Sequence, residues 1–345
     1  MTAPLPAQLP GTTTGDLLLQ VRDLRVEFST PHGPARAVRG LDLDVHAGEA
    51  LAVVGESGSG KSVTMLAILG MLRGARVTGS ARFRGTELIG MPDPALRRVR
   101  GASVSMVFQD PMASLNPVLP IGRQLALVMR THQPGMSKRL AGQRAVELLD
   151  RVAIPQPSRR AHQYPHELSG GMRQRVMIAM AIANSPDVLI ADEPTTALDV
   201  TVQAQIMELL RDLQAEQGLA LVLITHDLGV VAGSADRVAV MYAGRVVERG
   251  EVGPLFGDPG HPYTRGLLAC LPRLDARHTI EAAIPGVPAA PTALPSGCPF
   301  HPRCSLAVAA CAEAEPVLVE RGPTRVACSV TAPDPSVLST RAVPS

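Results

Sequence analysis

Eight consecutive residues near the start of the chain have the types and spacing of a phosphate-binding loop. They follow a continuous apolar run at 50–54 and precede a stretch of helical periodicity at 63–72. Glycines let backbone N–H groups approach a phosphate closely, and the helix that follows turns its positive end toward the anion. We expect nucleotide phosphates to bind Gly55, Glu56, Ser57, Gly58, Ser59, Gly60, Lys61 and Ser62.

Two residues of this loop have individual roles. Lys61, one of two lysines in an arginine-rich chain, would place a point charge beside the β- and γ-phosphates. The hydroxyl of Ser62 is suited to bind a Mg²⁺ ion between those phosphates. A flexible Gly/Ser turn is the alternative, which the strand, loop and helix context disfavours. Alone, the loop indicates only a nucleotide-binding protein.

A pair of acids follows a second apolar run, at 188–191. Ligands of open α/β sheets bind at the carboxyl ends of the strands, so both acids should face the phosphates. Asp192 fits the role of orienting Mg²⁺, and Glu193 fits that of a general base for the attacking water. Adjacent acids at a strand end are often only a solvated turn, but the phosphate loop favours the functional interpretation.

The run Leu168–Gln174, Leu-Ser-Gly-Gly-Met-Arg-Gln, resembles the signature sequence of ABC ATPases. A Ser-Gly-Gly before a helix offers backbone donors and a positive helix end to a phosphate. The resemblance implies that this phosphate belongs to an ATP held by a second subunit. A plain helix N-cap is the alternative. The implied contact residues are Ser169, Gly170, Gly171 and Gln174.

Other positions resemble landmarks of the same family. Gln109 resembles the Q-loop glutamine, which contacts Mg²⁺ together with Ser62 and Asp192 and links the core to a helical subdomain. Asp199, in Ala-Leu-Asp, resembles the D-loop at the dimer interface, and His226 the switch histidine that positions the γ-phosphate and the water. Phe28 resembles the aromatic residue that stacks on adenine, although a core aromatic is equally consistent with its context.

Longer runs resemble the ATP-binding proteins of dipeptide and oligopeptide importers. They are Phe108–Pro117, Tyr164–Ser169, Ile190–Thr201 and His261–Thr264, and the likeness covers most of 17–330. The last run lies outside the ATPase motifs, so ATP chemistry alone does not dictate it.

The resemblance implies that ATP and Mg²⁺ are bound between two head-to-tail ATPase subunits, and that hydrolysis powers import of di- or oligopeptides. The implied partners are two membrane permease subunits, a second ATPase subunit that is a copy or a paralogue, and, indirectly, an extracellular solute-binding protein. The chain would then lie peripherally on the cytoplasmic face of the cell membrane. Import of another small solute, such as a metal chelate or glutathione, is one alternative.

A soluble ABC ATPase acting on nucleic acid or ribosomes is another alternative, which a net charge of +2 without a basic cluster disfavours. A regulatory module without turnover is a third alternative. The presence of both Glu193 and His226 opposes it.

Four of the five cysteines cluster near the C-terminus, at irregular spacing. Because disulfides are disfavoured in the cytosol, four clustered thiols suggest a metal. Their spacing lacks the Cys-x-x-Cys of zinc sites, and the resembled importer proteins carry such a segment, in some members with a 4Fe–4S cluster. Zinc or unliganded thiols are the alternatives. The expected ligands are Cys298, Cys304, Cys311 and Cys328, whereas Cys270 is expected to be a small buried residue.

The elements that position these residues follow from apolar periodicity. The alternation of strands and helices predicts an α/β fold, and the resemblance implies a P-loop ABC ATPase core with an antiparallel β subdomain, a helical subdomain and a Cys-rich C-terminal extension. Strands are expected at 17–28, 41–45, 50–54, 187–191, 219–225, 238–242 and 245–248, and the apolar runs among them indicate a largely parallel buried sheet.

Composition sets the domain limits. The Pro- and Thr-rich start has no signal-peptide pattern, and no run approaches the roughly 20 apolar residues that a membrane span needs. We expect a disordered tail at 1–15, the ATPase domain at 16–255 with its helical subdomain at about 112–183, and the Cys-rich extension at 256–345.

Overall fold

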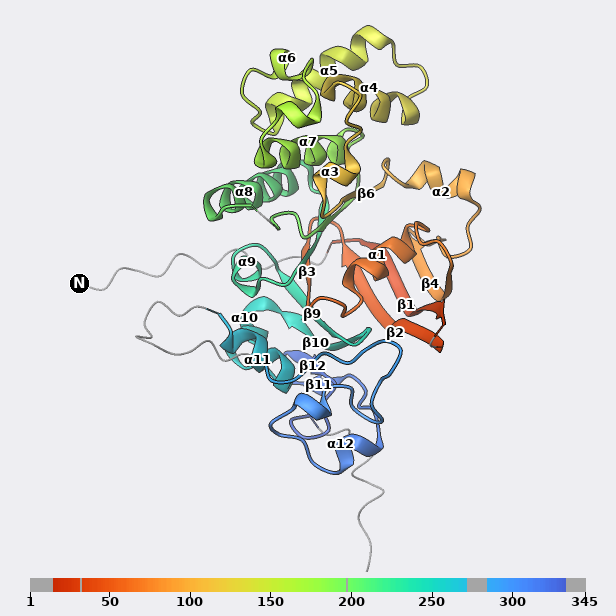
Figure 1. Ribbon diagram of the computed structural model, residues 1–345, viewed down its shortest axis with the longest axis vertical. Helices are drawn as coiled ribbons and strands as arrows, with labels where there is room; N and C mark the ends of the chain where they lie inside the picture. The colour runs from red at the N-terminus through yellow and green to blue at the C-terminus, as the bar shows by residue number, and fades with distance from the viewer. Residues whose placement is uncertain (1–14, 32, 197, 272–283, 333–345) are drawn as a thin grey trace, which may run out of the picture.

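The computed structural model describes residues 15–31, 33–196, 198–271 and 284–332. Nearly all of the expected tail at 1–15, and Ala197 of the expected D-loop, lie outside these ranges. Figure 1 shows a main sheet in the middle of the molecule, with a group of helices above it, an antiparallel sheet beside it and the C-terminal segment, residues 284–332, below it.

The antiparallel sheet has the strand order β2-β1-β4-β5. Its strands are β1 (Leu17–Thr30), β2 (Gly33–His46), β4 (Ala75–Phe83) and β5 (Thr86–Glu87), followed by helix α2 (Asp93–Val99). Leu19 of β1 pairs with Val45 on one side and Phe83 on the other, and all three side chains are buried. The expected first strand pair is therefore present, with a second strand that begins eight residues earlier than expected.

The main sheet has the order β11-β12-β10-β9-β3-β8-β7-β6. Its members are β3 (Ala50–Val54), β6 (Val104–Val107), β7 (Val188–Asp192), β8 (Ala220–Thr225), β9 (Arg237–Tyr242), β10 (Arg245–Glu251), β11 (Val319–Arg321) and β12 (Thr324–Val326). The five strands β9, β3, β8, β7 and β6 pair in parallel, and every residue of β3, β7 and β8 is buried. Parallel strands buried on both faces explain their uninterrupted apolar sequences.

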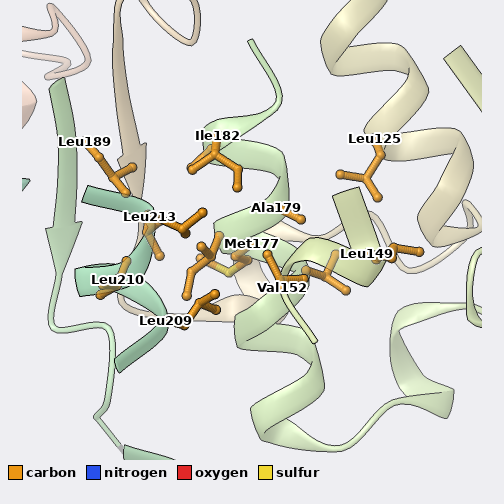
Figure 2. Close-up of a cluster of buried hydrophobic side chains, with 14 of the residues drawn as sticks. Leu125, Leu149, Val152, Met177, Ala179, Ile182, Leu189, Leu209, Leu210 and Leu213 are labelled. Atoms are coloured by element: carbon orange, nitrogen blue, oxygen red, sulfur yellow. The ribbon is translucent and has the colours of Figure 1, made fainter. Parts of the chain in front are cut away.

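The helices above the sheet form the expected helical part. They are α3 (Pro111–Ser114), α4 (Ile121–His132), α5 (Lys138–Arg151), α6 (Pro157–Arg160), the 3₁₀ turn η1 (Pro165–Glu167) and α7 (Gly170–Ile182), with α8 (Val200–Gln217) beneath them. Figure 2 shows Met177 and Ile182 of α7 packed between Leu149 of α5 and Leu213 of α8. A shared core therefore joins the helical part to the sheet.

The remaining helices lie on both faces of the main sheet: the first packs with the antiparallel sheet in the cluster of Leu51 and Val53, and helices from the C-terminal half pack in the cluster of Ala52 and Val54. They are α1 (Lys61–Ile68), α9 (Leu228–Ala232), α10 (Val252–Gly257), α11 (Pro262–Ala269), the 3₁₀ turn η2 (His301–Arg303) and α12 (Ala310–Glu313). Strand β12 pairs with β10, so the sheet continues across residue 255 into the C-terminal segment. Arg39 of β2 also holds this segment through an ion pair with Glu315, at 2.7 Å.

Candidate functional site

The glycine-rich loop joins β3 to α1. Gly60 precedes α1 with φ at +101°, and a Cβ atom there would lie 2.5 Å from the carbonyl oxygen of Ala37. Both facts require glycine at this position. The loop therefore packs too tightly at Gly60 for a side chain, and the backbone N–H groups in the first turn of α1 remain as donors.

Lys61 begins α1 and is buried, with its Nζ donating to the carbonyl oxygens of Gly55 at 2.7 Å and Glu56 at 3.0 Å. Burial lowers the pKa of Lys61, while the charges of Glu193 and Asp192 act in the opposite direction. The ammonium group is thus held against the glycine-rich loop and close to two carboxylates.

Asp192 ends β7, and its Oδ1 accepts a hydrogen bond from Ser62 Oγ at 2.8 Å. Burial raises the pKa of Asp192, and the neighbouring charge of Glu193 adds to the increase. Two oxygen ligands from positions 62 and 192 therefore meet at one point. Oxygen donors of this kind suit Mg²⁺.

Glu193 follows with φ at +46°, a conformation that non-glycine residues adopt uncommonly. Its Oε2 accepts hydrogen bonds from Gln109 Nε2 and Thr196 Oγ1, each at 2.9 Å. Nδ1 of His226, in the loop after β8, lies 3.4 Å from its Oε1. The strained backbone and these contacts fix the carboxylate beside Asp192, as strain at functional sites often does.

The signature residues lie at the start of α7. Ser169 Oγ caps this helix by accepting from Met172 N–H at 3.3 Å, and Gly171 packs so closely on Val202 of α8 that a Cβ would meet that side chain at 2.7 Å. Gln174 is buried, and its Nε2 has no hydrogen-bond partner among the described residues. No hydrogen bond in the described ranges connects these residues to the glycine-rich loop.

Two further predicted residues have structural contacts of their own. Asp199 is exposed and caps α8, with its Oδ1 accepting from Val202 N–H at 2.9 Å. Phe28 is half-buried on β1 against the core of the antiparallel sheet. Its position is compatible with a core aromatic and with an aromatic that stacks on adenine.

Two family models match the chain. The model described as ABC transporter matches residues 38–196, and the one described as oligopeptide/dipeptide transporter, C-terminal region, matches residues 247–311. The oligopeptide transport ATP-binding protein OppD of Escherichia coli (strain K12) is 52% identical over 92% of this chain and 92% of its own length. The chain belongs to the oligopeptide/dipeptide family of ABC transporter ATP-binding proteins.

Other relatives agree on the family. OppD of Mycobacterium tuberculosis (strain ATCC 25618 / H37Rv) is 54% identical over 88% of this ABC protein, which spans about half of the mycobacterial chain (50%). The dimeric ATP-binding cassette MJ0796 in a post-hydrolysis state bound to ADP and phosphate matches with a TM-score of 0.62 and 29% identity, over 68% of this chain and 99% of that one. The predicted ABC ATPase fold with antiparallel and helical parts is therefore confirmed.

The four clustered cysteines of this ABC protein lie in the C-terminal segment, where Cys298 N–H donates to the carbonyl oxygen of Cys311 at 2.8 Å. Burial raises the pKa of the Cys298 thiol to about 11, and the thiols of Cys311, Cys328 and Cys304 contribute to the increase. All four lie in the described ranges, and none is in a disulfide. Within those ranges, however, no three Cys, His, Asp or Glu side chains are placed so that they could hold a metal ion.

Two residues outside the ABC motifs contact the phosphate loop, and the motif reasoning did not identify them. The hydroxyl of Tyr263 on α11 accepts a hydrogen bond from Glu56 N–H at 2.8 Å. Arg303 in η2 forms an ion pair with the Glu56 carboxylate at 2.6 Å. For Tyr263 the sequence does contain an indication, because the run His261–Thr264 resembles the importer family although it lies outside the ATPase motifs. Nothing adjacent to Arg303 indicates its distant partner.

Proposed function

We propose that this chain is the ATP-binding and ATP-hydrolysing subunit that powers import of di- or oligopeptides through separate membrane permease subunits. The observation that carries the ATPase assignment is the convergence of Ser62, Asp192 and Glu193 from distant parts of the chain. The peptide assignment is supported by relatives named as oligopeptide transport ATP-binding proteins, and by a putative peptide import ATP-binding protein of Brucella abortus (strain 2308), 51% identical over 87% of this chain.

Each residue of the site has a proposed part in hydrolysis. Backbone donors of residues 55–62 and the Lys61 ammonium bind the β- and γ-phosphates of ATP. Mg²⁺, held by Ser62 and Gln109 and oriented by Asp192, would neutralise charge on those phosphates. Glu193 accepts the proton of the attacking water as the bond to the γ-phosphate forms. His226, which lies beside Glu193, orients the water and the γ-phosphate.

Two copies of the ATPase fold are proposed to complete each site. Ser169, Gly170, Gly171 and Gln174 of one subunit would contact the γ-phosphate bound by the other, with Asp199 at the interface. The exposed N-terminus of α7 supports this, because a helix N-terminus attracts an anion. The related cassette MJ0796 is described as dimeric in two solved structures. Loss of the γ-phosphate would then separate the two subunits and pass motion to the permease.

The permease is proposed to dock in a mainly apolar cleft of about 390 Å³ between α4 and β6. Leu127 and Val128 line it from α4, and Phe108, next to Gln109, lines it from the core. No helix in the described ranges is long and apolar enough to cross a membrane. We propose that docking in this cleft places the chain peripherally on the cytoplasmic face of the membrane.

Replacing Leu127 with glutamate is expected to weaken this docking. Leu127 is 57% exposed, so a carboxylate there stays hydrated in the free chain, but it would be buried without a partner in an apolar contact. Recovery of permease subunits with the tagged Leu127→Glu chain from gently solubilised membranes should fall about tenfold or more, since an unpaired buried charge costs well over 1.4 kcal/mol. ATP binding should remain.

Val308→Glu provides the matched control. Val308 is 53% exposed and lies in the C-terminal segment, away from the cleft. This variant should recover as much permease as the wild-type chain. Equal recovery with both variants would remove the cleft from the docking proposal, and a wild-type chain that brings down no membrane protein would remove the transporter proposal itself.

We also propose that the four cysteines are ligands of an iron–sulfur cluster, with a zinc ion as the alternative metal. Their convergence supports this, although the side chains as placed do not form a closed metal site, so no step of hydrolysis is derived through it. Protein purified without oxygen should absorb visible light and contain iron and sulfide in equal amounts. Zinc alone would support the alternative, and the absence of both would leave the thiols unliganded.

A further inference from the structure

The phosphate loop is held from outside the ATPase motifs by a two-point contact on Glu56. Arg303 Nη1 donates to Glu56 Oε2 at 2.6 Å, and Nη2 donates to Oε1 at 2.9 Å. This pairing is bidentate, the geometry in which guanidinium and carboxylate bind most strongly. The Arg303 side chain is only 4% exposed and the Glu56 side chain 25%, so water and salt screen the pair only in part.

Other contacts along the Arg303 side chain hold it in place. Its Nε donates to the carbonyl oxygen of Pro285 at 2.8 Å, and its guanidinium lies 5.9 Å from the ring centres of Tyr242 and Phe300. Both rings contact Tyr263, at centroid separations of 4.7 and 5.3 Å. An arginine held in this way loses little freedom when it pairs with a carboxylate.

The second point is the Tyr263 hydroxyl, which accepts from Glu56 N–H. Tyr263 is fully buried, and burial raises the pKa of its hydroxyl, so it stays protonated at neutral pH. His261 places it by capping α11, with Nδ1 accepting from Tyr263 N–H at 3.0 Å. Burial lowers the pKa of His261 to about 3, which keeps this ring nitrogen unprotonated as an acceptor.

The charge of Glu56 explains why such a contact matters for ATP. Glu56 is the second residue of the phosphate loop, and its own carbonyl oxygen accepts from Lys61 Nζ. A carboxylate beside a site for polyphosphate repels the ligand unless a cation neutralises it. Arg303 supplies that cation from a position 247 residues away in the sequence.

We propose that Arg303 and Tyr263 are positioning residues of the ATP site, through which the C-terminal segment and α11 neutralise Glu56 and fix the start of the phosphate loop. The inference rests on the proposed ATPase function. It makes the C-terminal segment part of the nucleotide site, acting through Glu56 and not by contact with ATP.

The test compares two arginines that both tie the C-terminal segment to the rest of the protein. Arg303→Met removes the pair with Glu56, whereas Arg39→Met removes the pair with Glu315, which does not involve the phosphate loop. Fluorescent ATP-analogue titration of the full-length chain should show about tenfold or weaker affinity in Arg303→Met, as expected for an unpaired, partly buried carboxylate. Arg39→Met should stay within about twofold of wild type in ATP affinity, because the Arg39 side chain bonds Ala243 and Glu315 and touches neither Glu56 nor the phosphate loop.

Removing the unpaired charge provides the decisive second arm. In the double variant Arg303→Met with Glu56→Gln, ATP affinity should return to within about threefold of wild type, and raising the salt concentration should recover part of the loss in Arg303→Met alone, because salt screens the repulsion. Thermal melts of each variant check that the chain is folded. Tyr263→Phe deletes one oxygen and should weaken ATP binding severalfold. Neither Glu56→Gln nor added salt should reduce this loss.

Three results would overturn the inference while leaving the proposed ATPase function intact. They are equal losses in Arg303→Met and Arg39→Met, no rescue by Glu56→Gln, and unchanged ATP affinity in Tyr263→Phe. A wild-type chain that does not bind the ATP analogue would instead contradict the proposed function.

Discussion

Glu193→Gln is expected to reduce ATP hydrolysis by the assembled transporter about a hundredfold to a thousandfold, in line with the loss of a general base. The amide oxygen can still accept from Gln109 and Thr196, so the local geometry should persist. What it loses is the ability to take the proton of the attacking water. ATP binding should stay near the wild-type level, because the phosphate loop is unchanged. Phosphate release and analogue titration measure the two quantities.

Glu216→Gln is the matched control for this prediction. Glu216 is an exposed carboxylate on α8 that pairs with Arg151, and it is remote from the site residues. Loss of this carboxylate should leave both phosphate release and ATP affinity within about twofold of wild type, as for surface changes generally. Turnover that is equally unaffected in Glu193→Gln would show that Glu193 is not the base.

Ser169→Ala is the prediction with the second-largest effect. The hydroxyl caps α7 and, in the proposed dimer, contacts the γ-phosphate held by the other subunit. Losing a hydrogen bond that acts on developing charge should lower the turnover number of the assembled transporter about tenfold or more. ATP binding by the isolated chain should be unchanged, because the substitution leaves the phosphate loop of that chain intact. Turnover and analogue titration again separate these effects.

Ser137→Ala distinguishes the catalytic effect from the structural one. Ser137 caps α5 in the same helical part, with its Oγ accepting from Leu140 N–H at 3.2 Å. Each substitution removes one helix cap, so each should cost about 1 kcal/mol of stability. If Ser137→Ala lowers turnover as much as Ser169→Ala does, the loss comes from the helical part and the proposed role of the signature is wrong.

Local spacing was sufficient to predict the parts of the site that are continuous in sequence. A phosphate loop must follow a strand and precede a helix, so the run ending in Lys61 and Ser62 and the run ending in Asp192 each carry their own structural context. The structure brings Ser62 and Asp192 together, and it places His226 beside Glu193. The confirmed ABC fold accounts for this agreement.

The contacts of Glu56 could not be predicted in the same way. Its partners Tyr263 and Arg303 are 207 and 247 positions away, and neither has a neighbour whose pattern specifies the pairing. Strand β12 has three residues, too short for periodicity to reveal, yet it pairs with β10 and carries the sheet past residue 255. Such contacts depend on the packing of the whole chain, which single-sequence patterns do not encode.

Peptide uptake by the purified transporter in liposomes tests the central proposal most directly. The complex would contain this chain, its co-purifying permease and ATPase subunits, and the solute-binding protein. We predict that a labelled oligopeptide accumulates only when ATP is present on the side of the ATPase subunits, and that Glu193→Gln in every copy of this chain abolishes the accumulation. Uptake that continues without ATP, or that is unchanged by Glu193→Gln, would contradict the account.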